Sequence, residues 1–158
     1  MSKLELKITP EFPGGTVVYD PGVMIPRLEM LNNIRNVFQN FGFSPLETPI
    51  LQKEIVLTGG DSDMRIFKIH EEARTDSARA LRFDLTVPFS VFIASNMGTI
   101  KFPFKRREIG AVFRPETAQK GRYNQFYQCD IDVAGVESGV ADAEIIAVMV
   151  STLKALNV

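Results

Sequence analysis

The sequence is poor in the residues that build disulfides and metal sites: its 158 residues include one cysteine, Cys129, and one histidine, His70. One cysteine excludes a disulfide within the chain, and the two residues fall short of the four ligands that a structural zinc ion takes. No apolar run is long enough to span a membrane, and residues 1–7 do not resemble a signal peptide. We therefore expect a cytoplasmic protein with no metal site and no membrane partner.

The chain also lacks an excess of charge of either sign, because 18 Lys and Arg residues face 19 Asp and Glu residues. This balance excludes the whole-chain basic field that dominates non-specific nucleic-acid binding. Any contact with RNA must be local, or must lie on residues outside this chain. The length fits one domain or part of one, and 45% hydrophobic residues are enough for a core.

Hydrophobic spacing predicts helices at both ends and strands in the middle. Residues 1–22 predict an irregular lead-in, since proline and glycine are dense after residue 10. Two apolar stripes have helical spacing: Met24, Leu28, Leu31, Ile34, Phe38 and Phe41, and then Ile146, Met149, Val150, Leu153 and Leu156. Between them we expect strands at 44–48, 64–69, 79–85, 106–113 and 125–133, and a short helix at 88–96. This order predicts an α+β fold with a mainly antiparallel sheet flanked by helices.

The strand at 125–133 has one apolar and one polar face, because strand side chains alternate. Tyr127, Cys129, Ile131 and Val133 share the apolar face, whereas Phe126, Gln128, Asp130 and Asp132 share the polar one. Aspartate is a poor strand former, and two neighbouring carboxylates repel unless a cation lies between them. A merely solvated face is the alternative.

Two other segments predict similar polar rows. Arg82, Asp84 and Thr86 would share a face opposite Leu81, Phe83 and Leu85, and Arg114 and Glu116 would continue the polar face of the strand before them. If these strands are neighbours, Arg82, Arg114 and Arg122 lie near carboxylates and an aromatic ring. Such a surface suits a ligand with both anionic and cationic groups, although an ordinary surface ion-pair network would give the same pattern.

Four segments carry a family resemblance, the first of them across the eighteen positions 113–130. Phe113-Arg114-Pro115-Glu116, followed by Arg122, Phe126 and Asp130, resembles motif 2 of the class II aminoacyl-tRNA synthetases, and residues 40–49 resemble their motif 1. Leu81-Arg-Phe-Asp-Leu-Thr-Val-Pro88 is similar to the RYDLTVP segment of eukaryotic- and archaeal-type histidyl-tRNA synthetases. Residues 121–135 are similar to their GRYREFYQCDFDIAG segment.

The resemblance implies a class II catalytic-core fold and a set of ligand contacts. For ATP it implies Arg114 at the α-phosphate as the catalytic residue, Arg122 at the β- and γ-phosphates, Glu116 at the adenine amino group and Phe126 against the adenine ring. For histidine it implies Asp84 and Asp132, with Thr86 and Gln128 beside them. Magnesium, tRNA(His) in the full-length enzyme and a homodimer complete the implied partners.

The resemblance places residues 23–158 in a partial catalytic domain, with motifs 1 and 2 but without motif 3 or an anticodon-binding domain. We therefore expect a fragment with impaired activity. Pro115 departs from the family pattern and stiffens a loop that approaches tRNA in this class, which puts the tRNA step in doubt. Two alternatives remain: a histidine-binding relative such as the regulatory subunit of ATP phosphoribosyltransferase, and a dimerisation module.

For some residues the sequence predicts only ordinary structural roles. His70 is expected at the surface, Cys129 as a small buried hydrophobic residue, residues 59–61 in a turn, and Lys105-Arg106-Arg107 at a solvated strand end.

Overall fold

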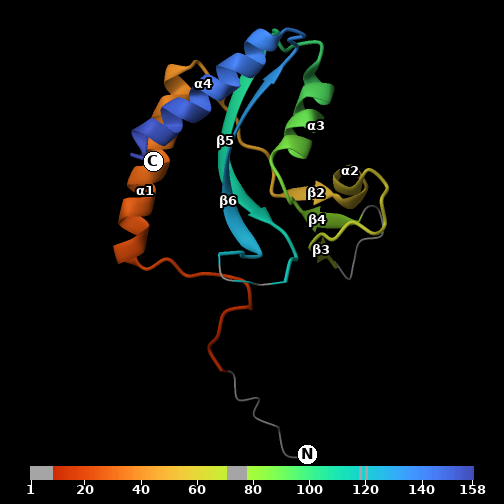
Figure 1. Ribbon diagram of the computed structural model, residues 1–158. Helices are drawn as coiled ribbons and strands as arrows, with labels where there is room; N and C mark the ends of the chain where they lie inside the picture. The colour runs from red at the N-terminus through yellow and green to blue at the C-terminus, as the bar shows by residue number, and fades with distance from the viewer. Residues whose placement is uncertain (1–8, 71–77, 118, 120) are drawn as a thin grey trace, which may run out of the picture.

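The computed structural model describes residues 9–70, 78–117, 119 and 121–158 (Figure 1). Along the chain its elements are α1 (Pro21–Asn40), β1 (Ser44–Pro45), β2 (Leu51–Lys53), α2 (Glu54–Thr58), β3 (Lys68–Ile69), β4 (Arg79–Leu81), α3 (Thr86–Asn96), β5 (Phe104–Phe113), β6 (Gln125–Ala134) and α4 (Gly139–Ala155). None of the described helices is both long and apolar enough to cross a membrane.

Two small sheets form the strand layer. β5 and β6 pair antiparallel along their whole length, and β1 adds to β5 in parallel. The second sheet has the order β2-β4-β3 and is antiparallel. Figure 1 shows α1 and α4 on one side of the long β5–β6 hairpin, with α3 and the β2-β4-β3 sheet on the other. The predicted α+β fold with a mainly antiparallel sheet is thus confirmed.

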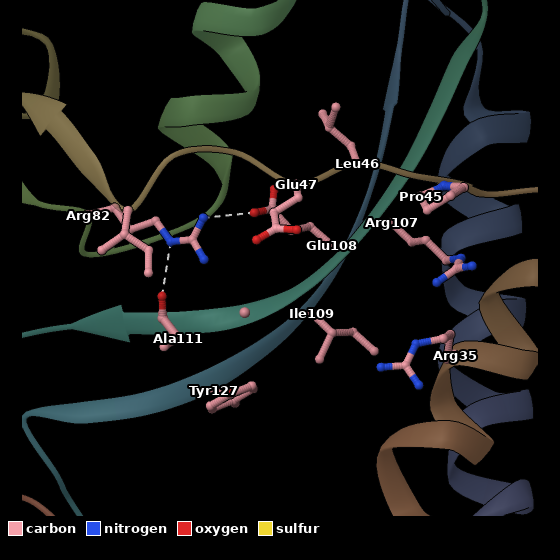
Figure 2. A pocket seen from close by; sticks show the side chains of 12 residues that line it. Arg35, Pro45, Leu46, Glu47, Arg82, Arg107, Glu108, Ile109, Ala111 and Tyr127 are labelled. Atoms are coloured by element: carbon pink, nitrogen blue, oxygen red, sulfur yellow. Dashed lines mark hydrogen bonds and ion pairs between the residues drawn. The ribbon is translucent and has the colours of Figure 1, made fainter. Parts of the chain in front are cut away.

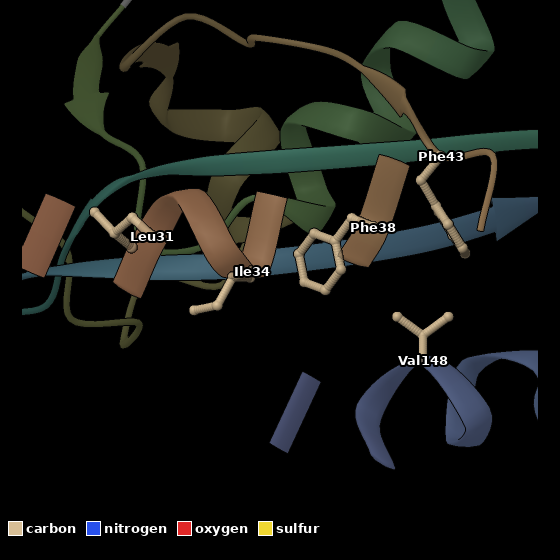
Figure 3. Close-up of a cluster of buried hydrophobic side chains, with 5 residues drawn as sticks. All are labelled: Leu31, Ile34, Phe38, Phe43 and Val148. Atoms are coloured by element: carbon tan, nitrogen blue, oxygen red, sulfur yellow. The ribbon is translucent and has the colours of Figure 1, made fainter. Parts of the chain in front are cut away.

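The main core lies between α1, α4 and one face of the hairpin. Its buried members come from α1, the turn after it and α4 (Figure 3): Leu31, Ile34, Phe38, Phe43 and Val148. Cys129, Ile131 and Val133 pack against them from β6, which confirms three members of the predicted apolar face, with Cys129 partly buried. The fourth, Tyr127, is exposed. α1 begins at Pro21, inside the expected lead-in, because the Asp20 side chain accepts a hydrogen bond from Val23 N (3.1 Å) and caps the helix.

The face that α4 buries differs from the prediction. Ile146, Met149, Val150 and Leu153 are between 45% and 61% exposed, whereas Val148 is fully buried. Leu156 is the one residue of the predicted stripe that packs against the core. Ile145, which is not part of that stripe, packs there too. Apolar residues surround much of this helix, so spacing alone could not decide which stripe faces the sheet.

The segment before α3 also differs from the prediction. The expected strand at 79–85 ends at Leu81, and the expected helix at 88–96 already begins at Thr86. The Asp84 Oδ1 atom accepts a hydrogen bond from Val87 N (3.2 Å), which supports the helix start and makes residues 82–85 a turn. Arg82, Asp84 and Thr86 therefore do not share a strand face.

Shorter elements were least predictable. The expected strands at 44–48 and 64–69 shrink to β1 and β3, and β2 and α2 lie where no element was predicted. Gly59, with φ +59°, ends α2 in the left-handed conformation and confirms the turn at 59–61. His70 is exposed, as expected. Most of the polar loop expected at 71–78 lies outside the described residues.

Candidate ligand-binding site

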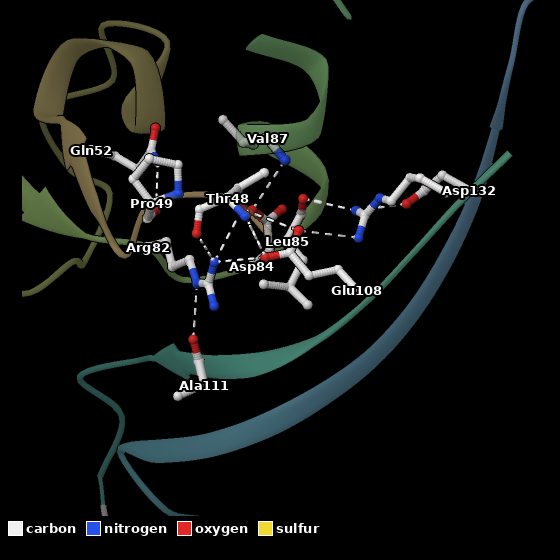
Figure 4. A network of polar contacts seen from close by, with 11 residues as sticks. Thr48, Pro49, Gln52, Arg82, Asp84, Leu85, Val87, Glu108, Ala111 and Asp132 are labelled. Carbon is white, nitrogen blue, oxygen red and sulfur yellow. Dashed lines mark hydrogen bonds and ion pairs between the residues drawn. The ribbon is translucent and has the colours of Figure 1, made fainter. Parts of the chain in front are cut away.

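A buried ion pair joins β5 to the turn before α3 (Figure 4). Arg82 Nη1 lies 2.8 Å from Glu108 Oε1, and the two side chains are 3% and 2% exposed. Thr48 donates its backbone N–H (3.0 Å) and its hydroxyl (2.9 Å) to the same carboxylate oxygen. Arg82 also donates from Nε to the Ala111 carbonyl (2.9 Å). This network fixes the turn at 82–85 against the centre of β5.

Arg106 lies deeper on the same face of β5. The expectation of a solvated Lys105-Arg106-Arg107 cluster is wrong for this residue, which is 0% exposed. Strand alternation places Arg106 on the face towards α3, where its guanidinium lies 4.7 Å from the Phe89 ring centroid. Lys105 and Arg107 point to the opposite side, where Lys105 Nζ lies 2.6 Å from Glu144.

Three half-buried carboxylates gather around this arginine: Asp84 from the turn, and Asp130 and Asp132 from β6. Burial raises the pKa of each, because it disfavours the charged form. The Arg106 charge opposes this rise in pKa in all three, whereas neighbouring carboxylates add to it. A cationic ligand group would relieve the repulsion, so this cluster is suited to bind one.

A cavity of about 440 Å³ lies at the end of β5, and its lining includes Phe83, the residue before Asp84. Arg114, Glu116 and Arg122 line it, together with Arg65 and Phe83. Arg114 donates from Nε to the Phe83 carbonyl (3.0 Å), which lies next to Asp84 in the chain. Three guanidinium groups in one cavity suit an anionic ligand such as a phosphate chain.

Two aromatic and polar details complete the site. The Arg114 guanidinium carbon lies 5.1 Å from the Phe126 ring centroid, within cation–π range. The Gln128 Oε1 atom is buried, and no described residue donates a hydrogen bond to it. An unsatisfied buried acceptor calls for an explanation, and a ligand N–H is one.

A larger cavity, about 540 Å³, lies on the other side of the Arg82–Glu108 pair, against β1 (Figure 2). Arg35, Arg107 and Tyr127 line it, but none of the expected ligand-binding residues does. Burial, followed by the charge of Arg35, lowers the pKa of Arg107. Among the residues that the structure describes, no group of three or more acidic, cysteine or histidine side chains could hold a metal ion.

Known proteins are similar to this chain over nearly its whole length. A family model described as histidyl-tRNA synthetase matches residues 20–158. The histidine–tRNA ligase of Helicobacter acinonychis (strain Sheeba) is 46% identical over 153 residues, which are 95% of this chain and 34% of that protein. The corresponding protein of Rhodopirellula baltica is 41% identical over 141 residues, 89% of this chain and 32% of its own length.

The chain belongs to the histidyl-tRNA synthetase family.

A solved structure agrees with this membership. The crystal structure of histidyl-tRNA synthetase from Nostoc sp. PCC 7120 has a TM-score of 0.80 and 37% identity, and the match covers 93% of this chain and 34% of that one. The chain spans about a third of the length of the curated relatives it matches. These relatives are bacterial, so they give no support to the eukaryotic- or archaeal-type sequence that the motifs suggested.

A further structure bears on the regulatory-subunit alternative. It is described as an ATP phosphoribosyltransferase regulatory subunit/histidyl-tRNA synthetase from Bacillus halodurans C, with a TM-score of 0.79 over 92% of this chain and 38% of its own. Its 24% identity shows a shared fold and no more.

Within the family fold, the expected ligand residues form two neighbouring groups. Arg114, Glu116 and Arg122 line one cavity, and Asp84 and Asp132 face Arg106 beside it. Thr86 is exposed in the first turn of α3. The sequence-based prediction did not include Arg65 or Arg106 among the site residues. For Arg106 a signal was available, because Arg106 and Glu108 share one face of their strand while Ile109 lies on the other.

Proposed function

We propose that this chain provides the ATP- and histidine-binding part of a histidine–tRNA ligase, in which histidine is converted to histidyl-adenylate. One observation carries the proposal: the carboxylate cluster adjoins the arginine-lined cavity. Burial raises the pKa of Asp84, and the Arg114 charge opposes part of this rise, so an arginine of the cavity lies within electrostatic reach of a carboxylate of the cluster. Histidine and ATP, which react through the amino-acid carboxylate and the α-phosphate, require such neighbouring subsites.

On the ATP side, Arg114 would contact the α-phosphate and Arg122 the β- and γ-phosphates. Glu116 would accept a hydrogen bond from the adenine amino group, and Phe126 would stack on the ring. Arg122 Nη1 lies 3.5 Å from Glu116 Oε2, with the two side chains 67% and 46% exposed. An exposed pair of this kind is weak, so ATP can separate it at little cost.

On the histidine side, Asp84 and Asp132 would hold the α-ammonium and imidazole groups, with Thr86 and Gln128 beside them. The unsatisfied Gln128 Oε1 supports this assignment, because both substrate groups carry N–H donors. A substrate cation would also offset the mutual repulsion of the carboxylates.

The reaction needs positioning more than a protein nucleophile. A histidine carboxylate oxygen bonds to the α-phosphorus while the bond from that phosphorus to the pyrophosphate oxygen breaks. Arg114 would act as the catalytic residue by offsetting the negative charge that develops at the α-phosphate. Magnesium would arrive with ATP, because it binds phosphate oxygens. Transfer to tRNA(His) is proposed for the full-length enzyme.

Other expectations stay predictions: the homodimer, the cytoplasmic location, the tRNA partner and the sequence type. Dimerisation has one supporting observation, since apolar residues of α1 are exposed, among them Val23, Ile25 and Leu28.

The test is histidine-dependent exchange of labelled pyrophosphate into ATP, with magnesium, in this chain and in Arg114→Ala. We expect slow exchange that requires histidine and falls at least about a hundredfold in the variant, as when one transition-state charge contact is removed. Arg107→Ala is the matched control, because this arginine lies outside the ATP cavity.

If exchange is absent, calorimetric titration of each ligand decides between the functions. Binding of both ATP and histidine would support a substrate-binding part that lacks catalytic groups. Binding of histidine alone would favour the regulatory-subunit function, and binding of neither would contradict the proposal.

A further inference from the structure

Arg106 connects the two segments that carry the carboxylates of the proposed histidine subsite. It stands directly opposite Asp132 in the β5–β6 register. Its Nη2 atom lies 2.6 Å from Asp132 Oδ2 and donates to the Leu85 carbonyl at 2.8 Å. Leu85 lies between Asp84 and Thr86, so one guanidinium fixes where β6 and the turn before α3 lie relative to each other.

The contacts around Arg106 are poorly explained by stability alone. Glu108, its neighbour on the same face, already binds Arg82 and Thr48 through Oε1. The other carboxylate oxygen, Oε2, lies 3.5 Å from Arg106 Nη1. The Nε and Nη1 groups of Arg106 are buried, and no described residue accepts a hydrogen bond from them. A buried guanidinium with unsatisfied donors reduces stability relative to an apolar residue of similar size. Its presence therefore needs another reason.

Charge supplies that reason. Burial raises the pKa of Asp84, Asp130 and Asp132, and the Arg106 charge opposes part of this rise in each. Without this charge the three carboxylates would take up protons more readily and bind a cation less well. Arg114 acts in the same direction on Asp84, but it is not among the charges that influence Asp130 or Asp132.

We propose that Arg106 is a positioning residue for histidine recognition: it holds Asp132 and the Asp84 turn in the geometry that receives the cationic groups of the substrate. This inference rests on the proposed function. Arg106 does not touch the substrate in this arrangement; it acts through Asp132 and the Leu85 carbonyl.

Lysine cannot replace this residue in full. The forked, planar guanidinium contacts Asp132, the Leu85 carbonyl and the Phe89 ring together, whereas one ammonium on a flexible stem has no fork to span them. Lysine does keep the buried positive charge. Arg106→Lys therefore separates the loss of geometry from the loss of charge, and Arg106→Met removes both.

The experiment is calorimetric titration of histidine and, separately, of MgATP into the chain and its two variants, with melting temperatures recorded for each. For Arg106→Lys we expect the dissociation constant for histidine to rise about tenfold or more, as when a charge-assisted hydrogen bond is lost. The dissociation constant for ATP should stay within about twofold. Arg107→Lys, on the opposite face of β5, is the control and should leave both unchanged.

The pH dependence gives a second readout. In Arg106→Met, acidification should abolish histidine binding at a higher pH than in the parent chain, because Asp132 then takes up its proton earlier. A role in folding alone would not shift this pH.

Four results would overturn the proposal. Unchanged histidine affinity in Arg106→Lys would refute it while leaving the proposed function intact. Equal loss of ATP and histidine binding, or failure of both variants to fold, would make Arg106 a residue of general stability. Absence of histidine binding in the parent chain would refute the proposed function itself, and this inference with it.

Discussion

Arg82 and Glu108 come from segments 26 residues apart in the sequence and form a buried ion pair, with Nη1 2.8 Å from Oε1. Glu108 stands near the middle of β5, and Arg82 begins the turn that leads into α3. Removal of one partner would leave the other charged and buried, which is far more destabilising than loss of an exposed pair.

Arg82→Met should therefore lower the free energy of unfolding by about 3–5 kcal/mol, measured by urea denaturation. The control is Lys68→Met, which breaks the Lys68–Glu54 pair (2.7 Å) between more exposed side chains. That change should cost no more than about 1 kcal/mol. Equal effects of the two substitutions would contradict the structural importance of the buried pair.

Gly110 leaves room for the same arginine. A Cβ atom at this position would overlap Arg82 Nη2, which the network holds in place. Gly110→Ala should destabilise the protein by about 1–3 kcal/mol, the range for overpacking a filled interior. Gly98→Ala is the matched control, since no atom lies within 4 Å of its added Cβ. A neutral effect at Gly110 in the same denaturation assay would show that Arg82 can move.

Arg122 is expected to contribute to ATP binding and little to stability. Its contact with Glu116 is exposed, so Arg122→Ala should change the free energy of unfolding by less than about 0.5 kcal/mol. Loss of a charge-assisted phosphate contact should raise the dissociation constant for MgATP about tenfold, by calorimetry. Lys101→Ala, an exposed cation outside both cavities, should leave it unchanged. An unchanged dissociation constant for MgATP in Arg122→Ala would show that Arg122 does not belong to the proposed site.

Asp130 gives a prediction on pH. Burial raises its pKa above the ordinary value of 3.8, so the folded state binds the proton more tightly than the unfolded chain does. Its ionisation therefore destabilises the protein above the raised pKa, and this penalty fades as pH falls towards 3.8. Asp130→Asn should raise the free energy of unfolding at pH 7, with the gain shrinking on acidification. Glu137→Gln, at an exposed site, is the control and should change the free energy of unfolding little at pH 7 or at acidic pH. A lower free energy of unfolding in Asp130→Asn at pH 7 would contradict the raised pKa of Asp130.

The orientation of α4 can be tested with two alanine substitutions. Val148 is fully buried and Ile146 is 61% exposed, although the sequence favoured the stripe that contains Ile146. Val148→Ala should cost about 2 kcal/mol of unfolding free energy, for the loss of two buried methyl groups. Ile146→Ala should change it by less than about 0.5 kcal/mol. The reverse order would mean that α4 is rotated in solution.

The sequence alone determined the features that depend on a short period or on one contiguous motif. The buried residues Leu31, Ile34 and Phe38 of α1 followed from spacing, because backbone geometry fixes which side chains point the same way. The same holds for most of the two faces of β6, whereas Leu28 and Tyr127 were expected to be buried and are exposed. The motif 2 residues Arg114, Glu116 and Arg122 were named from their order, and the structure places all three on one cavity.

Tertiary structure decided which faces are covered. Several stripes of α4 are apolar, and only its place against the sheet selects the one with Val148. Arg106 was taken for a solvated residue because a basic run at a strand end usually is one, yet α3 and the turn at 82–85 cover it. Burial depends on segments brought together from distant parts of the chain, and no local pattern contains that information.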